Sequence, residues 1–288
     1  MKYWTRITGL AAAGLAGLTG AGVLGTRLWN RRTEQLVAQL AGPLPGAGHQ
    51  VFTMEELTGL PVPVANYFRF ALQPGQALIR RARLRETGGF RAGTSWSSFT
   101  AVHHVHTLPP GFVWDARIYM LPLLPVQIRD SYVAGSGAMQ GRLAGLLPVV
   151  KESNRPDLDA GALLRYLAEA VWYPTALLPS QGVTWSALDN ASALATLTDG
   201  HTTVSLQFYF GEQGEIVRCY TPARFRDVNG AGVPTPWGGT YHTYIQAAGM
   251  RVPQAGEVAW FLPEGPRAYW RGRLQCTFDF GLPPFKGV

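Results

Sequence analysis

Apolar and polar residues alternate along several stretches of this chain, and this period-two pattern constrains the fold more than any other feature. In residues 112–120 every even position is apolar, and residues 204–210 alternate almost as strictly. In residues 270–280, Leu274 and Phe278 share one face, whereas Arg273 lies on the opposite face. Because successive side chains of a strand point to opposite faces, these stretches predict antiparallel strands that are covered on one side.

Short turn sequences separate the alternating stretches, as expected for strands that are joined by hairpins. Counting the stretches between these turns predicts about twelve strands. The turn sequences are Thr87–Gly89, Asp199–Gly200, Gly211–Gly214, Asn229–Gly230 and Glu264–Pro266.

Residues 160–173 interrupt the alternation with apolar residues at helical spacing, between a cap at Asp157 or Asp159 and a stop at Pro174. A shorter helix is predicted to begin at residues 61–63, since proline fits a first helical turn. A curved sheet around the longer helix would cover all apolar faces at once. The expected fold class is therefore α+β: a strongly curved, largely antiparallel sheet, an open or half barrel, around a central helix, plus one N-terminal transmembrane helix.

The segment from Ile7 to Thr26 contains no charged residue over twenty positions. A helix of this length crosses a hydrocarbon core of about 30 Å. Residues 1–30 are therefore predicted to be a single-pass membrane anchor with flanking basic residues. The alternative is a cleaved secretory signal with Lys2 and Arg6 as its basic region. No convincing small-residue cleavage site follows, which favours the uncleaved anchor.

Positive charge is concentrated around this segment. Five of the 25 Lys and Arg residues lie in residues 1–32, where there is no acidic residue. The rest of the chain contains the other 20 basic residues and all 18 acidic residues. The body of the chain is thus nearly neutral, which argues against nucleic acid as a partner. The basic residues on the two sides of the segment nearly balance, so the positive-inside rule leaves the orientation open. The periplasmic or extracellular side is favoured for the body.

Residues 31–55 are predicted to be a linker because Gly and Pro crowd positions 42–48, and residues 56–288 are predicted to form a single β-rich domain. Small residues at four-residue spacing would form one face of the anchor helix. They are Ala13, Gly17, Ala21 and Gly25. Such a face supports close helix pairing and hence a homodimer, although an Ala- and Gly-rich segment also produces this spacing by chance.

Four charged residues are candidates for a polar cluster. Asp115 and Arg117 lie on the polar face of one predicted strand, and Arg129 and Asp130 lie on the next. Together they would form a polar cluster inside a cavity. The alternative is a solvated strand face with cross-strand ion pairs, each worth at most about 1 kcal/mol.

Arg165 and Glu169 are four residues apart on the predicted central helix, and Trp172 follows nearly one turn later. One interpretation is a carboxylate that an arginine holds beside an aromatic wall, facing a ligand. The other is an ion pair that ties the helix to the sheet. Glu169 is the first candidate for acid–base chemistry, and Asp115 is the second.

His104 and His106 share a strand face and could both bind Zn²⁺, but no further ligand lies at a useful spacing, so no metal is expected. Cys219 and Cys276 are the only cysteines. They either pair in an exported domain or stay as buried thiols. The sequence has no P-loop, dinucleotide fingerprint or GxSxG elbow, and no cofactor is expected.

Nine Trp, eleven Tyr and thirteen Phe could line an apolar pocket as well as fill a core. The ligand-binding residues are expected among these aromatics and the polar residues near them. The candidates are Trp114, Arg117, Asp130, Arg165, Glu169, Trp172, Trp237 and Trp260.

Several stretches of the body resemble an uncharacterised family of bacterial membrane-anchored proteins, known only as a domain of unknown function. They are residues 60–64, 67–69, 111–117, 165–179, 235–238 and 257–260, of which RYLAEAVWYPTALLP at 165–179 is the most specific. This resemblance implies no established activity and no catalytic residue. The expected architecture is also similar to that of periplasmic lipoprotein carriers, whose curved antiparallel sheet covers helices and encloses an apolar cavity. That similarity rests on architecture and not on a motif.

These observations predict a membrane-tethered binding domain with an apolar cavity for a lipid, an acyl chain or a lipidated partner. An enzyme that acts on a membrane-derived substrate, with Glu169 or Asp115 as its acid–base group, is the first alternative. A structural or assembly protein that uses an outer face is the second.

Overall fold

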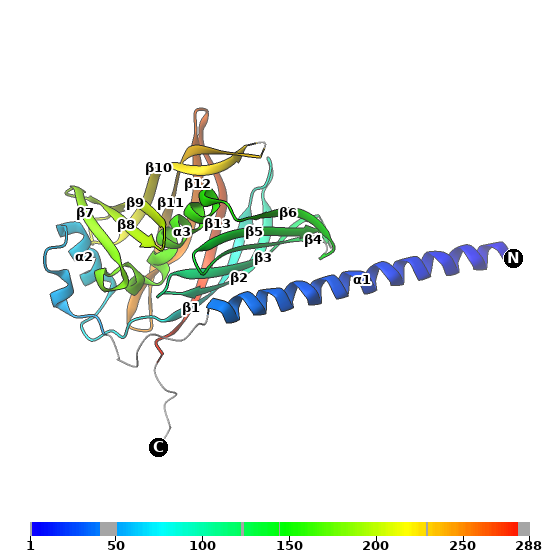
Figure 1. Ribbon diagram of the computed structural model, residues 1–288, viewed down its shortest axis with the longest axis horizontal. Coiled ribbons are helices and arrows are strands. Elements are labelled where there is room, and N and C mark those ends of the chain that lie inside the picture. The colour runs from blue at the N-terminus through cyan, green and yellow to red at the C-terminus, as the bar shows by residue number, and fades with distance from the viewer. Residues whose placement is uncertain (1, 41–50, 122–123, 144, 229, 282–288) are drawn as a thin grey trace, which may run out of the picture.

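Thirteen antiparallel strands form one sheet in the computed structural model, which describes residues 2–40, 51–121, 124–143, 145–228 and 230–281 (Figure 1). The strands are β1 Arg81–Phe90, β2 Ser97–His106, β3 Gly111–Leu121, β4 Leu124–Val133, β5 Ser136–Leu143, β6 Leu147–Ser153, β7 Val183–Asp189, β8 Ser192–Asp199, β9 Thr202–Phe210, β10 Ile216–Val228, β11 Ala231–Ala247, β12 Met250–Leu262 and β13 Gly265–Asp279. This architecture confirms the predicted curved, largely antiparallel sheet.

The sheet consists of two meanders that meet in its middle. Strands β1 to β6 lie side by side in chain order, as do β7 to β13, and the first and last strands, β1 and β13, pair with each other. Along this seam Arg81 pairs with Asp279 and Phe90 pairs with Trp270. β6 and β7 are the two edge strands, so the sheet is open.

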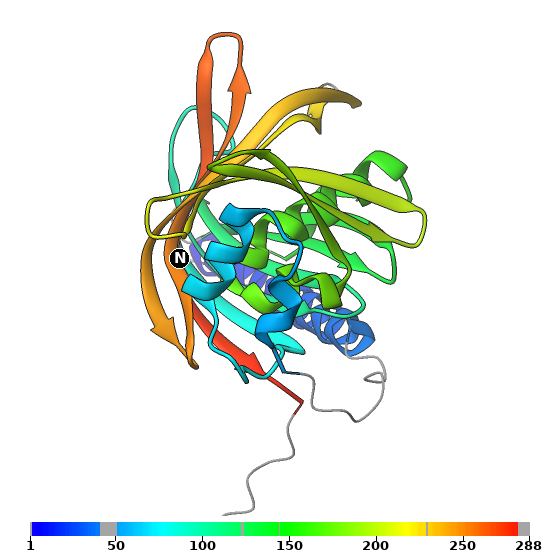
Figure 2. The same cartoon turned by 90° about the vertical axis from the view of Figure 1, so that its left-hand side faces the viewer.

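The central helix α3, Pro156–Glu169, connects the two edge strands and runs inside the curve of the sheet (Figure 2). Its first turn contains proline and the acidic residues Asp157 and Asp159, which complement the positive end of the helix dipole. α3 packs against β3, β4 and β5 on one side and against β9 and β10 on the other. Beyond Glu169 the chain continues in the short turns η2 Ala170–Trp172, η3 Pro174–Leu177 and η4 Pro179–Gln181.

The shorter predicted helix is α2, Val62–Ala71, which follows the 3₁₀ turn η1 Met54–Leu57. It packs against β8, β9 and β12 and lies in front of α3 at one end of the curved sheet (Figure 2). Its Tyr67 and Phe68 are fully buried. α2 therefore closes this end of the space that the sheet surrounds.

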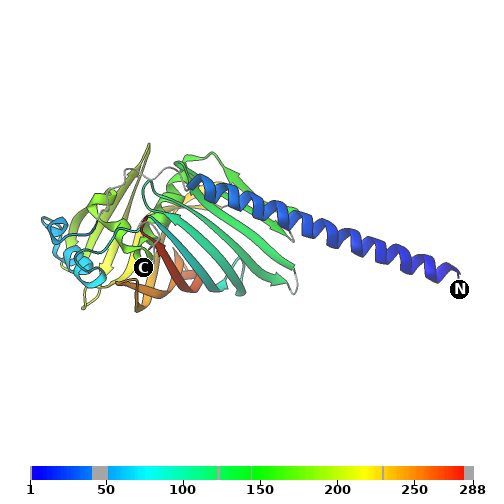
Figure 3. The same cartoon turned by 90° about the horizontal axis from the view of Figure 1, so that it is seen from below.

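The N-terminal helix α1, Lys2–Leu40, has 39 residues, and its C-terminal part packs on the outer face of β2, β3 and β4 (Figure 3). Residues 31–40, the first part of the predicted linker, continue this helix because they contain good helix formers and no Gly or Pro. Residues 41–50 of the predicted linker lie outside the described residues. Within the part of the chain that the structure describes, no helix offers an apolar stretch of membrane-spanning length.

One hydrophobic core fills most of the space between α3 and the inner face of the sheet. Alternate residues of each strand contribute to it, as the period-two pattern predicts. Leu84, Phe99 and Phe112 come from the first meander, and Leu206 and Phe208 come from the second.

Candidate functional site

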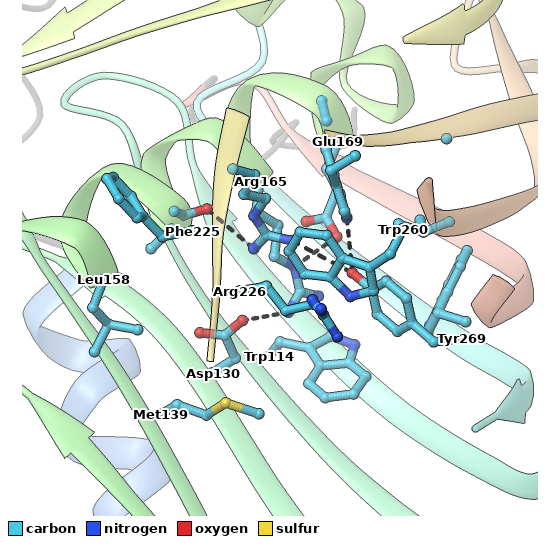
Figure 4. A pocket seen from close by; sticks show the side chains of 18 of the residues that line it. Trp114, Asp130, Met139, Leu158, Arg165, Glu169, Phe225, Arg226, Trp260 and Tyr269 are labelled. Carbon is cyan, nitrogen blue, oxygen red and sulfur yellow. Dashed lines mark hydrogen bonds and ion pairs between the residues drawn. The ribbon is translucent and has the colours of Figure 1, made fainter. Parts of the chain in front are cut away.

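A cavity of about 270 Å³ remains between α3 and the inner face of the sheet. Residues from β3 and β4, from β10 to β13 and from α3 line it (Figure 4). Nine aromatic side chains contribute to the lining, together with ten charged ones. The aromatics are Phe90, Trp114, Trp172, Phe225, Trp237, Tyr241, Trp260, Tyr269 and Trp270. The curve of the sheet therefore surrounds a space whose walls are largely apolar.

Two glycines in adjacent strands, Gly272 and Gly256, make room for two of these indoles. Gly272 of β13 pairs with Gly88 of β1 on one side and with Gly256 of β12 on the other. A Cβ atom on Gly272 would lie 2.6 Å from the Trp270 ring, and one on Gly256 would lie 3.2 Å from the Trp172 ring. The glycines let both rings lie directly on the backbone of the sheet.

Arg165 of α3 holds two carboxylates at the cavity wall (Figure 4). Its Nε donates to Oε1 of Glu169 at 2.8 Å, and its Nη1 donates to Oδ2 of Asp130 at 2.7 Å. The guanidinium also lies 4.9 Å from the centre of the Trp114 ring. Burial lowers the pKa of Arg165, but the attraction of Glu169, Asp130 and Glu86 outweighs burial and leaves this pKa raised. Arg165 therefore stays charged and fixes both carboxylates.

Glu86 and His103 lie behind this cluster, and neither is among the residues predicted to bind a ligand. Glu86 is 2% exposed and accepts a hydrogen bond from Nε1 of Trp114 at 2.8 Å. Nδ1 of the fully buried His103 lies 3.3 Å from Oε1 of Glu86 and 3.6 Å from Oε2 of Glu169. Both residues occupy inward positions of alternating strands, where apolar residues such as Leu84 are expected. A carboxylate or imidazole at an inward position breaks the alternation, and this break could have identified both residues from the sequence.

A second polar group surrounds Arg224 of β10. Its guanidinium lies 4.5 Å from the centre of the Trp237 ring, and its Nη2 donates to the Gly161 carbonyl at 3.2 Å. Nε1 of Trp237 donates to the Tyr269 hydroxyl at 3.0 Å. The ring of Trp260 stacks on that of Tyr269 at 6.1 Å between centres. Hydrogen bonds thus fix the orientation of the aromatic walls.

Five buried polar atoms of cavity-lining residues have no hydrogen-bond partner: Nε1 of Trp172, Nε1 of Trp270, Oε2 of Glu169, Nε of Arg224 and Nε of Arg226. A buried polar group without a partner costs about 1–3 kcal/mol, and folded proteins rarely contain many of them. Four N–H donors and one carboxylate oxygen beside the cavity are thus left without a partner in the folded chain. Beside aromatic walls, these atoms suit a ligand that has both an apolar and a polar part.

Most of the residues predicted to bind a ligand come together at this cavity. They are Trp114, Asp130, Arg165, Glu169, Trp172, Trp237 and Trp260. Arg117 does not join them, because it is exposed on the outer face of β3. Ligand binding by the seven residues stays a prediction.

The predicted cavity cluster of Asp115, Arg117, Arg129 and Asp130 is wrong. Asp130 faces the cavity, whereas the other three lie on the outer face of β3 and β4. The reason is the strand period: Trp114 points inward, so its neighbour Asp115 points outward. The register pairs Trp114 with Asp130 and Asp115 with Arg129, which separates the two pairs onto opposite faces.

Asp115 belongs instead to the contact between α1 and the sheet. Oγ1 of Thr33 donates to Oδ2 of Asp115 at 2.5 Å. Nη2 of Arg129 donates to the Thr33 hydroxyl and to the Trp29 carbonyl, both at 2.7 Å. Asp115 therefore faces away from the cavity and is poorly placed for acid–base chemistry there.

His104 and His106 line a groove beside the C-terminal end of α1, on the outer side of β2. No group of three His, Cys, Asp or Glu residues in the described ranges could hold a metal ion.

Cys219 and Cys276 are free thiols. Cys219 is buried and accepts a hydrogen bond from the Tyr241 hydroxyl at 3.1 Å.

Solved structures with some similarity to this chain include three β-rich proteins. A putative outer membrane lipoprotein-sorting protein domain from Vibrio parahaemolyticus matches with 10% identity and a TM-score of 0.37, over 71% of this chain and 87% of its own. A LolA superfamily protein from Nitrosomonas europaea has 7% identity and a TM-score of 0.30, with 78% and 92% covered. A β-barrel-like protein of another domain of unknown function, from Brucella abortus, has 10% identity and a TM-score of 0.23, with 70% and 98% covered. No curated protein matches the chain.

A family model matches residues 58–277, which is most of the chain. The match begins just before α2, ends within β13 and includes all the residues that line the cavity. It also includes residues 165–179, whose sequence resembles such a family most closely. The chain belongs to a family of unknown function, DUF6920.

Proposed function

We propose that this chain is a membrane-tethered binding domain whose cavity holds the apolar part of a lipid, an acyl chain or a lipidated partner. The observation that carries the proposal is the aromatic-lined cavity of about 270 Å³ between α3 and the sheet. Its volume is close to the lower end of the range for ligand pockets, about 300–1,000 Å³. It suits a short chain or one segment of a larger lipid.

The walls of the cavity match an amphiphile. Each methylene group that leaves water for an apolar site contributes about 0.8 kcal/mol. The unpaired N–H groups of Trp172 and Trp270 can donate to a carbonyl or phosphate oxygen. The cluster of Arg165, Glu169 and Asp130 provides a charged boundary on one side. Such a ligand would satisfy both the apolar and the polar surface.

The membrane part of the proposal rests on the sequence of residues 7–26, which contains no charge. A body that is held beside a bilayer meets lipids at high local concentration. The side of the membrane on which the body lies is left open by the balance of flanking basic residues.

Gly161 offers a direct test of cavity binding. It lies on α3 and lines the cavity, and a Cβ atom at this position would have only Nε of Arg224 within 4 Å, at 3.9 Å. A Gly161→Trp side chain would therefore extend into the cavity without colliding with the backbone. Gly161→Ala is the matched control, because it makes the same helical change and leaves the cavity almost empty.

The experiment compares the lipids that copurify with the full-length wild-type chain and with these two variants, by quantitative mass spectrometry, and the binding of a fluorescent fatty acid to each. Lipids that only surround residues 7–26 are the same in all three proteins. We expect Gly161→Trp to lose a bound species that Gly161→Ala retains. Equal lipid content and equal fatty-acid binding in all three proteins would rule out the cavity as a lipid site.

One observation favours an enzyme as the second candidate. Oε2 of Glu169 has no hydrogen-bond partner, and it lies 3.6 Å from Nδ1 of His103. A carboxylate beside an imidazole can exchange a proton with a substrate. Glu169→Gln keeps the size of the side chain and removes its acid–base capacity. An enzyme would then accumulate an intact lipid that the wild type holds as product, whereas identical bound species in both proteins would eliminate this candidate.

A further inference from the structure

Large apolar side chains are exposed at one end of the first meander. Tyr119 and Met120 near the end of β3 are 42% and 48% exposed. Leu146, Leu147 and Val149, in the turn before β6 and in β6 itself, are 38%, 63% and 51% exposed. These five residues are called the hairpin-end surface below.

The strand register places both parts of this surface at the same end of the sheet. Ile118 of β3 pairs with Val126 of β4, Val126 pairs with Leu143 of β5, and Leu143 pairs with Leu147 of β6. This row crosses four strands close to the points where β3 and β5 end. The exposed apolar residues therefore form one edge rather than scattered positions, and a grouped patch of this kind marks an interaction site.

Helix α1 leaves the domain at this same edge (Figure 3). Gly25 and Thr26 touch the turn between β5 and β6 at Gly145, whereas Leu40 lies against Gly111 at the opposite end of β3. The residues before Gly25 thus continue beyond the hairpin-end surface. Three exposed side chains on the adjoining turns of α1 are also apolar: Val23, Leu24 and Leu28 are 49%, 57% and 50% exposed.

Basic residues lie next to this apolar edge. Arg117 of β3 and Arg142 of β5 both pair with Gln127 of β4, one position along the strands from the apolar row. Arg27 and Arg31 are exposed on α1. An apolar edge beside a band of arginines is the arrangement with which peripheral segments bind anionic lipids. The same band would repel a second copy of this surface.

We infer that the hairpin-end surface lies in the headgroup region of an anionic bilayer, so that the domain contacts the membrane through the sheet as well as through α1. This inference goes beyond binding in the cavity. It rests on the proposed entry of residues 7–26 into the same bilayer, which places this edge at the lipid surface.

The test uses spin labels on single cysteines in the full chain, reconstituted into vesicles of phosphatidylglycerol and phosphatidylethanolamine. Leu147→Cys reports the hairpin-end surface, and Leu15→Cys reports the anchor segment. Leu188→Cys is the matched control, since Leu188 is an exposed leucine, 48% exposed, on the opposite edge strand β7. Burial raises the pKa of Cys219 to about 11 and that of Cys276 to about 12, so the native thiols react slowly at pH 7. The labelled wild type measures the remaining background.

The readout is the collision rate of each label with oxygen, which concentrates in lipid, and with a water-soluble nickel complex. At Leu147→Cys we expect several-fold less contact with nickel than at Leu188→Cys, while contact with oxygen is kept. Nickel contact that is equal at Leu147→Cys and Leu188→Cys, while Leu15→Cys is protected, would contradict contact between the hairpin-end surface and the bilayer. The membrane anchor would still be supported. If neither oxygen nor the nickel complex reaches Leu147→Cys, a protein partner covers the hairpin-end surface, and the inference of bilayer contact is wrong. Nickel contact at Leu15→Cys would contradict both the insertion of residues 7–26 into the bilayer and the contact of the hairpin-end surface with it.

Discussion

The indole Nε1 of Trp29 lies 3.0 Å and 3.1 Å from the two carboxylate oxygens of Asp115, so a side chain of α1 is hydrogen-bonded to the middle of β3. The guanidinium of Arg129, the register partner of Asp115 on β4, lies 4.0 Å from the centre of the same indole ring. Trp29 is only 3% exposed. A carboxylate and a cation from adjacent strands therefore hold one aromatic ring and fix the direction in which α1 leaves the sheet.

Trp29→Ala is expected to detach the C-terminal part of α1 from the sheet. Loss of a buried tryptophan typically lowers the free energy of unfolding by about 3–5 kcal/mol. Here the change also removes a donor to Asp115 and a ring beneath Arg129. Trypsin should then cleave much faster after Arg31 and Arg32, which mass spectrometry of timed digests will show.

Arg117→Ala is the control for this variant, because Arg117 is exposed on the same face of β3 and does not contact Trp29. Its digestion rate should match that of the wild type. Equal rates for Trp29→Ala and Arg117→Ala would show that Trp29 does not hold α1 in place.

Arg165→Met should strongly destabilise the domain. The change leaves the side chains of Glu169 and Asp130, only 15% and 16% exposed, without their cationic partner. Breaking a buried ion pair in this way costs about 3–5 kcal/mol. The measurement is urea unfolding followed by tryptophan fluorescence.

Arg155→Met is the matched comparison for Arg165→Met. Arg155 pairs with Asp157 near the start of α3, but its side chain is 35% exposed. An exposed ion pair of this kind contributes little to stability, because water and salt screen it. Similar losses for the two variants would mean that the Arg165 cluster is no more important to the fold than a surface pair.

The stability of the domain should fall on acidification through His104. Burial, together with the nearby charge of Arg83, lowers the pKa of His104 from 6.5 to about 4. Between these two values the unfolded chain binds a proton at His104 that the folded chain does not. The free energy of unfolding therefore rises with pH across this window. The contribution of His104 to stability is lost as the pH falls toward 4.

This effect can be checked by measuring the unfolding midpoint at several pH values between 4 and 7. His104→Gln should flatten the dependence, whereas His242→Gln, at an exposed position, should not. Parallel curves for the wild type and His104→Gln would exclude His104 as the source.

Neither cysteine should react with iodoacetamide in the folded chain near pH 8. Burial raises the pKa of the Cys219 thiol to about 11 and that of Cys276 to about 12, so only a small fraction is thiolate. Both should react after unfolding in urea, which intact mass spectrometry will count. Rapid labelling of either cysteine without denaturant would show that its strand opens in the folded state.

Much of the fold follows from local sequence patterns. Alternation along residues 112–120 correctly places Trp114 on the inner face and Asp115 on the outer face. What covers the outer face could not be predicted in the same way, because Trp29 lies 86 residues away from Asp115 and contacts it only after α1 docks. The helix over residues 31–40 was not predicted, because the glycines and prolines on which the linker prediction rests lie further along the chain, at 42–48.

The candidate site was predictable in part for the same reason. Trp172 and Glu169 follow the spacing of α3, so their common location could be derived from one helix. Glu86 and His103 come from two different strands. Only the register of β1 with β2, and of β2 with β3, brings them together with Trp114. Their inward positions could be read from the alternation, but the contacts between them could not.

The pairing of β1 with β13 has a consequence for how the chain reaches its fold. Arg81 and Asp279 are neighbours in the sheet although nearly the whole domain separates them along the chain. During synthesis, β1 can pair with β2 early, but its other edge stays open until β13 leaves the ribosome. Contacts between such distant segments form slowly, and open strand edges favour aggregation. The last strand to be made is therefore the one that completes the sheet, and truncation before residue 265 should leave two unjoined meanders rather than a smaller domain.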